Sequence, residues 1–158
     1  RDMYINACQN NCIKRFANIK NEIHFLFLSK QIMTTDYFSK LNSAEKHILK
    51  DKGTEAPFTG KYLDNKDEGI YKCVCCGQEL FSSTHKYDSQ SGWPSFYDVF
   101  KEKNVKLVSD KSHGMVRTEV TCSNCHAHLG HVFDDGPSPT YLRYCINSLS
   151  LNFDHENF

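Results

Sequence analysis

A thiol stands close to a guanidinium in residues 141–149. Polar and apolar residues alternate there as in a β-strand, which would place Arg143, Cys145 and Asn147 on one face. The opposite face would carry the residues suited to a core, Leu142, Tyr144 and Ile146. A neighbouring cation stabilises the thiolate, which is the nucleophilic form of cysteine. These residues alone leave two interpretations open, a reactive cysteine or a small buried hydrophobic residue.

The other cysteines include two pairs with the spacing of metal ligands. Each C-x-x-C pair can present two thiolates from one turn, and two facing turns make a closed tetrahedral zinc site. The predicted ligands are Cys73, Cys76, Cys122 and Cys125. Four protein ligands leave no position for water, so the zinc would be structural. Cys75 leaves the choice within the first pair open.

Two alternatives exist for these cysteines. Two disulfides would suit a secreted protein, but the sequence shows no secretory signal. Residues 122–126 also match the C-x-x-C-H pattern of covalent haem attachment, which does not account for the first pair. The zinc site is therefore the favoured prediction.

Two further segments carry candidate site residues. Residues 89–96 hold the single tryptophan, Trp93, in a loop of turn-forming residues, where it could form the wall of a pocket. Three histidines lie within residues 126–131, and histidine is the natural proton donor near neutral pH. A regular strand would send His128 and His131 to opposite faces. Both can serve one site only if Gly130 bends or bulges the strand.

Composition narrows the classes of function. The 158 residues favour one domain with its own core. The net charge is zero, so no basic surface favours nucleic acid. The longest apolar run, residues 23–28, is far too short to span a membrane. We expect a cytoplasmic or mitochondrial protein, and a monomer.

The chain divides near residue 34. Residues 1–34 are predominantly basic, with loosely spaced Phe and Ile. This N-terminal extension is expected to be a targeting segment, or a disordered or non-authentic segment with Met33 as the true start. Residues 35–158 are expected to form the catalytic domain.

Short strands predominate in the second part. A helix is expected from an N-cap at Ser43 to a stop at Gly53. The predicted strands are Gly69–Lys72, Glu79–Ser82, Lys106–Val108, Met115–Thr121, His128–Phe133, Leu142–Asn147 and Ser148–Phe153. Because no long helices separate them, the expected class is mainly β, with antiparallel sheets and a small helical lead-in.

Several motifs occur in the order found in one enzyme family. Residues 53–62, the two C-x-x-C pairs and residues 92–96, 128–133, 135–137 and 143–148 resemble the B-type methionine sulfoxide reductases. The resemblance covers about residues 40–153. It implies two antiparallel sheets, braced by structural zinc in a β-tent-like arrangement. It also implies reduction of methionine-R-sulfoxide, in proteins and in free form.

The resemblance also implies roles for the candidate residues. The Cys145 thiolate would attack the sulfoxide sulfur and be left as a sulfenic acid. His128 and His131 would supply acid and hydrogen-bond functions. Trp93 would pack the substrate methyl, and Phe133 would extend the apolar wall. Arg143 would hold the thiolate, and Asn147 would orient its neighbours.

The expected way of regeneration departs from the family pattern. Many relatives carry a resolving cysteine immediately before Gly-Trp-Pro, where this chain has Ser91. Cys75, Cys8 or Cys12 could replace it, or thioredoxin or another thiol could reduce the sulfenic acid directly, which we favour. Two other classes of function stay open from the residues alone: a zinc-stabilised binding module without catalysis, and a cysteine hydrolase.

Overall fold

The computed structural model describes residues 36–155. The expected N-terminal extension over residues 1–34 lies outside this range. Within it the chain forms nine β-strands and one α-helix, with short 3₁₀ turns between them. No helix in residues 36–155 is long and apolar enough to cross a membrane.

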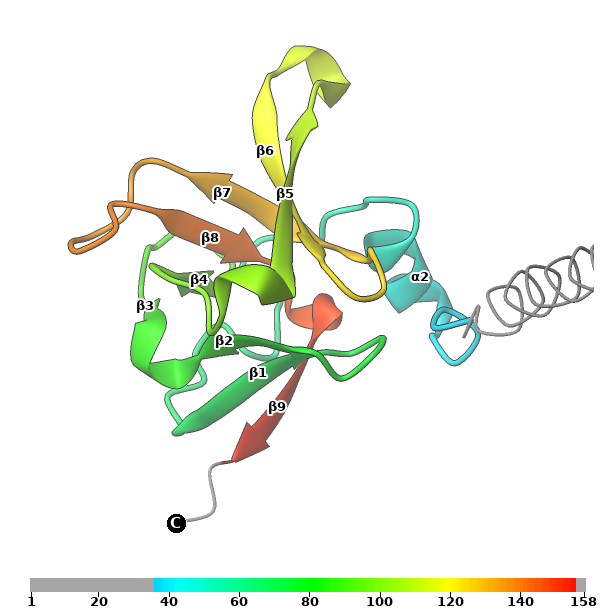
Figure 1. The fold of residues 1–158 in the computed structure, drawn as a ribbon, viewed down its shortest axis with the longest axis horizontal. Helices are drawn as coiled ribbons and strands as arrows, with labels where there is room; N and C mark the ends of the chain where they lie inside the picture. Colours follow the sequence, from blue (N-terminus) through cyan, green and yellow to red (C-terminus); the bar gives the residue numbers. More distant parts are fainter. Residues whose placement is uncertain (1–35, 156–158) are drawn as a thin grey trace, which may run out of the picture. The chain divides into compact units, whose positions relative to one another are not determined.

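The strands form two antiparallel sheets (Figure 1). The smaller sheet has the order β2-β1-β9 and the larger one the order β3-β4-β8-β7-β6-β5. The strands are β1 (Gly69–Cys73), β2 (Glu79–Ser82), β3 (Lys86–Tyr87), β4 (Ser95–Phe96), β5 (Val105–Asp110), β6 (Arg117–Cys122), β7 (His128–Phe133), β8 (Arg143–Ile146) and β9 (Leu151–His155). Both the mainly β class and the two antiparallel sheets are therefore confirmed.

Aromatic side chains join the two sheets. Phe81 of β2 stacks on Phe96 of β4 with ring centroids 4.5 Å apart, and Tyr71 of β1 meets Phe96 edge to face at 5.1 Å. All three are fully buried, as are Leu80 and Ile146. Burying such large rings removes much apolar surface from water and stabilises the face-to-face packing.

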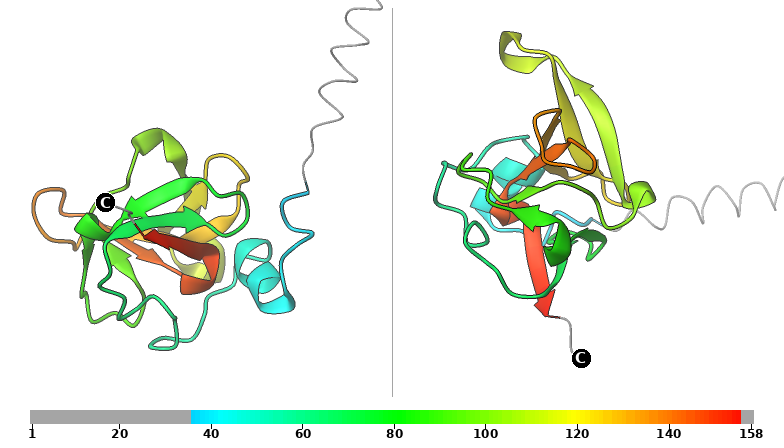
Figure 2. Two further views of the ribbon diagram at one scale, coloured as in Figure 1. Left: turned by 90° about the horizontal axis from the view of Figure 1, so that it is seen from below. Right: turned by 90° about the vertical axis from the view of Figure 1, so that its left-hand side faces the viewer.

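Strand β8 shows the predicted alternation. Tyr144 and Ile146 are buried in the core, whereas Arg143 and Cys145 are half-buried on the other face. β5 and β6 instead form a long hairpin that projects from the rest of the larger sheet (Figure 2). Most of β5 is exposed.

The helix α2 (Ser43–Leu49) begins one residue earlier than predicted. Its N-cap is Asn42, so the prediction of Ser43 as the cap was wrong. The Asn42 side chain accepts from the amide of Glu45 at 2.9 Å, and the Glu45 carboxylate accepts from the amide of Asn42 at 3.0 Å. This reciprocal capping box needs an acid three residues after the cap, which selects Asn42 over Ser43.

Other differences follow from long-range contacts. β3 and β4 were not predicted, because two-residue strands carry no periodicity that a sequence could reveal. The predicted strand Ser148–Phe153 is wrong at its start, where residues Ser148–Ser150 form a 3₁₀ turn and β9 begins at Leu151. The Glu55 carboxylate, far away in sequence, accepts from the amides of Ser148 and Leu149 and holds this turn.

Candidate active site

Cys145 lies in β8 between two neighbouring strands. It faces His131 of β7 on one side and Ser95 of β4 on the other. A cavity of about 120 Å³ opens beside it. The cavity is lined by Thr54, Trp93, Arg117, Gly130, His131, Phe133, Cys145 and Asn147. The fold therefore brings together five of the predicted residues, Cys145, His131, Asn147, Trp93 and Phe133, whereas His128 and Arg143 are not in its lining.

The two histidines lie on the same side of the sheet because β7 bulges. Val120 of β6 pairs with Gly130, but the next residue, Thr121, pairs with His128, so Leu129 is an extra residue in β7. The imidazole rings of His128 and His131 consequently approach to 5.4 Å between centroids. The strand therefore has the bulge next to Gly130 that would allow both histidines to serve one site. A Cβ at Gly130 would come 2.0 Å from the Cys145 carbonyl oxygen, so only glycine fits there.

Each histidine is hydrogen-bonded to a carboxylate. His128 Nδ1 donates to Glu119 Oε1 at 2.8 Å, and Lys52 Nζ donates to Glu119 Oε2 at 2.8 Å. His128 and Glu119 are both almost completely buried. Burial lowers the pKa of His128, against the opposing effect of Glu119. Burial would raise the pKa of Glu119, but the bonds from Lys52 and His128 outweigh it and lower that pKa.

The second pair of a histidine and a carboxylate, His131 and Asp110, connects the site to the β5–β6 hairpin. His131 Nε2 donates to Asp110 Oδ2 at 2.8 Å, and the Arg117 guanidinium donates to the same oxygen at 2.9 Å. Hydrogen bonds from Ser112, followed by the one from His131, lower the pKa of Asp110. Asp110 is therefore an anion that fixes the imidazole of His131. Sequence reasoning missed Asp110 and Glu119 because both act through cross-strand register.

The surroundings of Cys145 do not lower the pKa of its thiol, although the neighbouring Arg143 had suggested this from the sequence. Burial raises the pKa of the Cys145 thiol, and the Ser91 hydroxyl and the Arg143 guanidinium only partly offset this. Ser91 Oγ lies 3.9 Å from Cys145 Sγ. Arg143 forms two hydrogen bonds to Asp135, at 2.8 and 2.9 Å, and lies over the Phe133 ring. The sequence-based prediction of a thiolate favoured by Arg143 did not include burial or Asp135.

Alkylation of Cys145 is therefore expected to follow pH with a midpoint above about 8.5, the ordinary value for a cysteine thiol. Ser91→Ala should move this midpoint higher, because the hydroxyl donates to the thiolate. Mass spectrometry of the Cys145 peptide after timed exposure to iodoacetamide at a series of pH values measures it, with the same protein unfolded in urea as the reference. A midpoint below that of Cys145 in the unfolded protein would contradict the dominance of burial.

Glu55 is a third residue that the sequence did not reveal as part of the site. Its amide donates to Asn147 Oδ1 at 3.1 Å, and its carbonyl accepts from Trp93 Nε1 at 3.0 Å. Asn147 Nδ2 also donates to the Leu129 carbonyl at 3.0 Å. Glu55 thus connects the tryptophan and the asparagine of the cavity through its main chain. A lone acid between Thr54 and Ala56 carries no signal of such a role.

The four predicted metal ligands form a cluster away from Cys145. Their sulfur atoms all lie within 4.8 Å of one another, with 3.6 Å between Cys73 and Cys125 and 3.5 Å between Cys76 and Cys122. Tetrahedral zinc–thiolate bonds of about 2.3 Å place sulfurs about 3.8 Å apart, so the cluster fits such an ion. Hydrogen bonds among the four thiols lower the pKa of Cys76 and Cys122 and raise the pKa of Cys73 and Cys125. Cys75 lies outside the cluster and its thiol donates to the Tyr37 carbonyl at 3.2 Å.

The family profile of the SelR domain matches residues 41–155, and the chain belongs to this family. Among its curated relatives are three proteins with the name peptide methionine sulfoxide reductase MsrB. The one from Methanosarcina mazei is 56% identical over 121 residues, which cover 77% of this chain and 86% of that relative. Those from Methanosarcina barkeri and Saccharophagus degradans are 57% and 56% identical, over 73% and 74% of this chain and 82% and 87% of their own lengths. The family resemblance and the prediction of an oxidoreductase are therefore confirmed.

Proposed function

We propose that this protein reduces methionine-R-sulfoxide to methionine, in oxidised proteins and peptides and as the free amino acid, and so repairs oxidative damage. The observation that carries the proposal is the position of Cys145 in the wall of a cavity of about 120 Å³, whose lining also includes His131 and the aromatic residues Trp93 and Phe133. Such a cavity suits a thioether-sized group. The SelR family membership and the names of the relatives support the same substrate class.

The reaction transfers one oxygen atom between two sulfurs. Since burial raises the pKa of Cys145, its thiol gives its proton to His131 as the sulfur attacks. His131, held by anionic Asp110, passes this proton to the sulfoxide oxygen. The oxygen leaves the methionine sulfur and remains on Cys145 as a sulfenic acid, so Cys145 is oxidised by two electrons and the sulfoxide is reduced by two.

The remaining residues of the site have supporting roles in this proposal. Trp93 and Phe133 bind the methyl end of the substrate, and Asn147 orients groups at the cavity. Arg143 stabilises the developing thiolate from the same strand face. His128 holds His131 in place through ring contact and donates to the buried Glu119.

The cysteine cluster is proposed to hold one structural zinc ion. Cys73, Cys76, Cys122 and Cys125 would fill all four positions of a tetrahedral site. Cys73 ends β1 in the smaller sheet and Cys122 ends β6 in the larger one, so the ion would fasten the two sheets together. It takes no part in the chemistry at Cys145.

We propose that an external thiol, thioredoxin or a small one, reduces the sulfenic acid directly. Two thiols supply the two electrons, Cys145 returns to the thiol, and a disulfide and one water molecule are released. Ser91 occupies the position at which many relatives carry the resolving cysteine. Its hydroxyl lies 3.9 Å from Cys145 Sγ and cannot form a disulfide. The Cys75 thiol instead donates a hydrogen bond to the Tyr37 carbonyl, in the turn between Cys73 and Cys76.

Ser91→Cys is expected to create an internal disulfide, because Ser91 Oγ lies 3.9 Å from Cys145 Sγ, and side-chain rotation can bring a sulfur at this position to the bonding distance of about 2.05 Å. After one turnover without reductant, the variant should lose two free thiols and two mass units. The unsubstituted protein should lose one thiol and gain one oxygen. Thiol titration and intact-mass spectrometry measure both.

Ser89→Cys serves as the matched control, since Ser89 bonds to Ser91 and Ser95 but not to Cys145. If the unsubstituted protein itself loses two free thiols in one turnover, it contains an internal resolving cysteine, and direct reduction is contradicted.

A further inference from the structure

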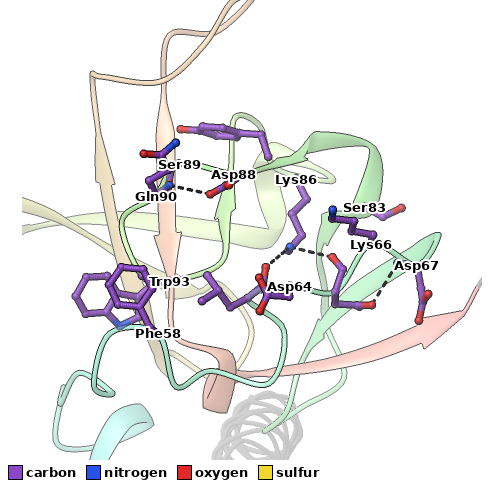
Figure 3. A pocket seen from close by; sticks show the side chains of 14 residues that line it. Phe58, Asp64, Lys66, Asp67, Ser83, Lys86, Asp88, Ser89, Gln90 and Trp93 are labelled. Atoms are coloured by element: carbon purple, nitrogen blue, oxygen red, sulfur yellow. Dashed lines mark hydrogen bonds between the residues drawn. The ribbon is translucent and has the colours of Figure 1, made fainter.

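A second, larger cavity adjoins the active site across Trp93. Its volume is about 550 Å³, and Trp93 contributes to the walls of both cavities. Figure 3 shows Trp93 and Phe58 at one end, with Asp64, Lys86 and Asp67 further along. A substrate side chain that enters the smaller cavity at Trp93 therefore has the larger one, here called the flanking groove, directly beside it.

The walls of the flanking groove are held in place by main-chain hydrogen bonds. The Phe58 amide donates to the Gly92 carbonyl at 2.8 Å, which ties the Phe58 loop to the loop of Trp93. Lys86 Nζ donates to the carbonyls of Leu63 and Asn65 at 2.8 and 2.9 Å, which fixes the far wall. Because these loops are bonded to each other and to β3, the groove is preformed rather than a gap between loose segments.

Phe58 is an unusual residue for such a position. Its side chain is 68% exposed, and its φ of +64° lies in the left-handed region, which is costly for a bulky residue. A Cβ on Gly92 would come 3.2 Å from the Phe58 ring, so the two loops are in close contact. The backbone thus presents an aromatic ring to solvent at the rim of the groove. An exposed ring in this position can pack against a side chain of a bound polypeptide.

The charges of the groove favour a cationic ligand. Three carboxylates line it, Asp64, Asp67 and Asp88, against two lysines. The two carbonyls hold the ammonium of Lys86 in place, and with both lysines counted the lining keeps an excess of one negative charge. An extended polypeptide with a basic side chain would complement this balance.

We propose that the flanking groove binds the polypeptide on either side of the oxidised methionine, with Phe58 packing on a neighbouring side chain and Asp64 favouring a basic one. The inference rests on the proposed function and extends it to substrate selection. Polypeptides then bind more tightly than the isolated amino acid, because only a polypeptide reaches both cavities.

Steady-state kinetics on the full chain tests this with three substrates. These are N-acetylmethionine-R-sulfoxide, a peptide with lysines within three residues of the sulfoxide, and the same peptide with glutamates instead. In the unsubstituted protein the lysine peptide is expected to have a KM about fivefold below that of the glutamate peptide and about tenfold below that of the amino acid derivative. Equal KM values for all three would overturn the proposal.

Two variants assign the effect to the groove. Phe58→Ala should raise KM for both peptides about fivefold, with kcat and the kinetics of the amino acid derivative unchanged. Asp64→Asn should remove most of the difference between the lysine and glutamate peptides. Leu107→Ala and Glu102→Gln, on exposed residues of the β5 region, are the matched controls and should change nothing.

Failure of the two proposals can be told apart. If the unsubstituted protein reduces none of the three substrates, the proposed function is wrong. If it reduces the peptides, but Phe58→Ala leaves the KM of both unchanged, the groove is not the peptide site.

Discussion

Replacing Cys145 with serine is expected to abolish sulfoxide reduction, with a fall in kcat of at least about a thousandfold. Serine lacks a thiolate to attack the substrate sulfur and cannot be oxidised to a sulfenic acid. The measurement incubates the protein with each epimer of methionine sulfoxide and dithiothreitol and quantifies methionine by chromatography. Only the R epimer should be consumed by the unsubstituted protein.

Cys75→Ser is the matched control, because Cys75 belongs neither to the cavity nor to the metal cluster. It should retain full activity. Activity that survives Cys145→Ser would place the chemistry elsewhere, and no activity with either epimer in the unsubstituted protein would favour a binding module. Hydrolysis of an ester or amide by Cys145 would identify a hydrolase instead.

Metal removal is expected to have the largest effect on stability. Stripping the ion with a chelator should lower the free energy of unfolding by at least about 3 kcal/mol and the unfolding midpoint by about 10 °C. The physical reason is that four thiols packed within 4.8 Å would lose the proposed cation, and the ends of β1 and β6 would lose their cross-link. Calorimetry with and without chelator, together with elemental analysis, measures both.

Cys76→Ala should reproduce the loss of metal and stability, whereas Cys75→Ser should keep about one zinc per chain. This pair of variants differs by one position in the same turn, so it separates a ligand from its neighbour. A midpoint that falls with thiol reductant but not with chelator would mean that the cluster is two disulfides.

The sequence predicted those features that depend on local pattern. The alternation of residues 142–147 placed Cys145 and Arg143 on one face, as β8 has them. The need for a bulge at Gly130 followed from the spacing of His128 and His131, and β7 has that bulge. The spacing of the C-x-x-C pairs predicted the cluster, and the structure adds which cysteine is left out, Cys75.

What the sequence could not supply depends on contacts between distant segments. Glu55 lies more than ninety residues from the turn that it holds. Asp110 reaches His131 only because β5 and β6 pair in one particular register. The direction of the Cys145 pKa shift depends on burial and on Asp135, which pairs with Arg143 from the loop before β8. None of these contacts follows from residue spacing.

The close approach of Gly130 to Cys145 constrains how this enzyme can evolve. The atoms that any added side chain would strike are main-chain atoms of Cys145 and Ile146, which cannot rotate out of the way. The separation between the strand of the histidines and the strand of Cys145 is therefore fixed by main-chain contact. Trp93 and the loop of Phe58 come from other places in the chain and can be exchanged without changing this strand pairing. Substitutions at Trp93 or Phe58 are thus expected to reshape the two cavities while Cys145 keeps its position beside His131.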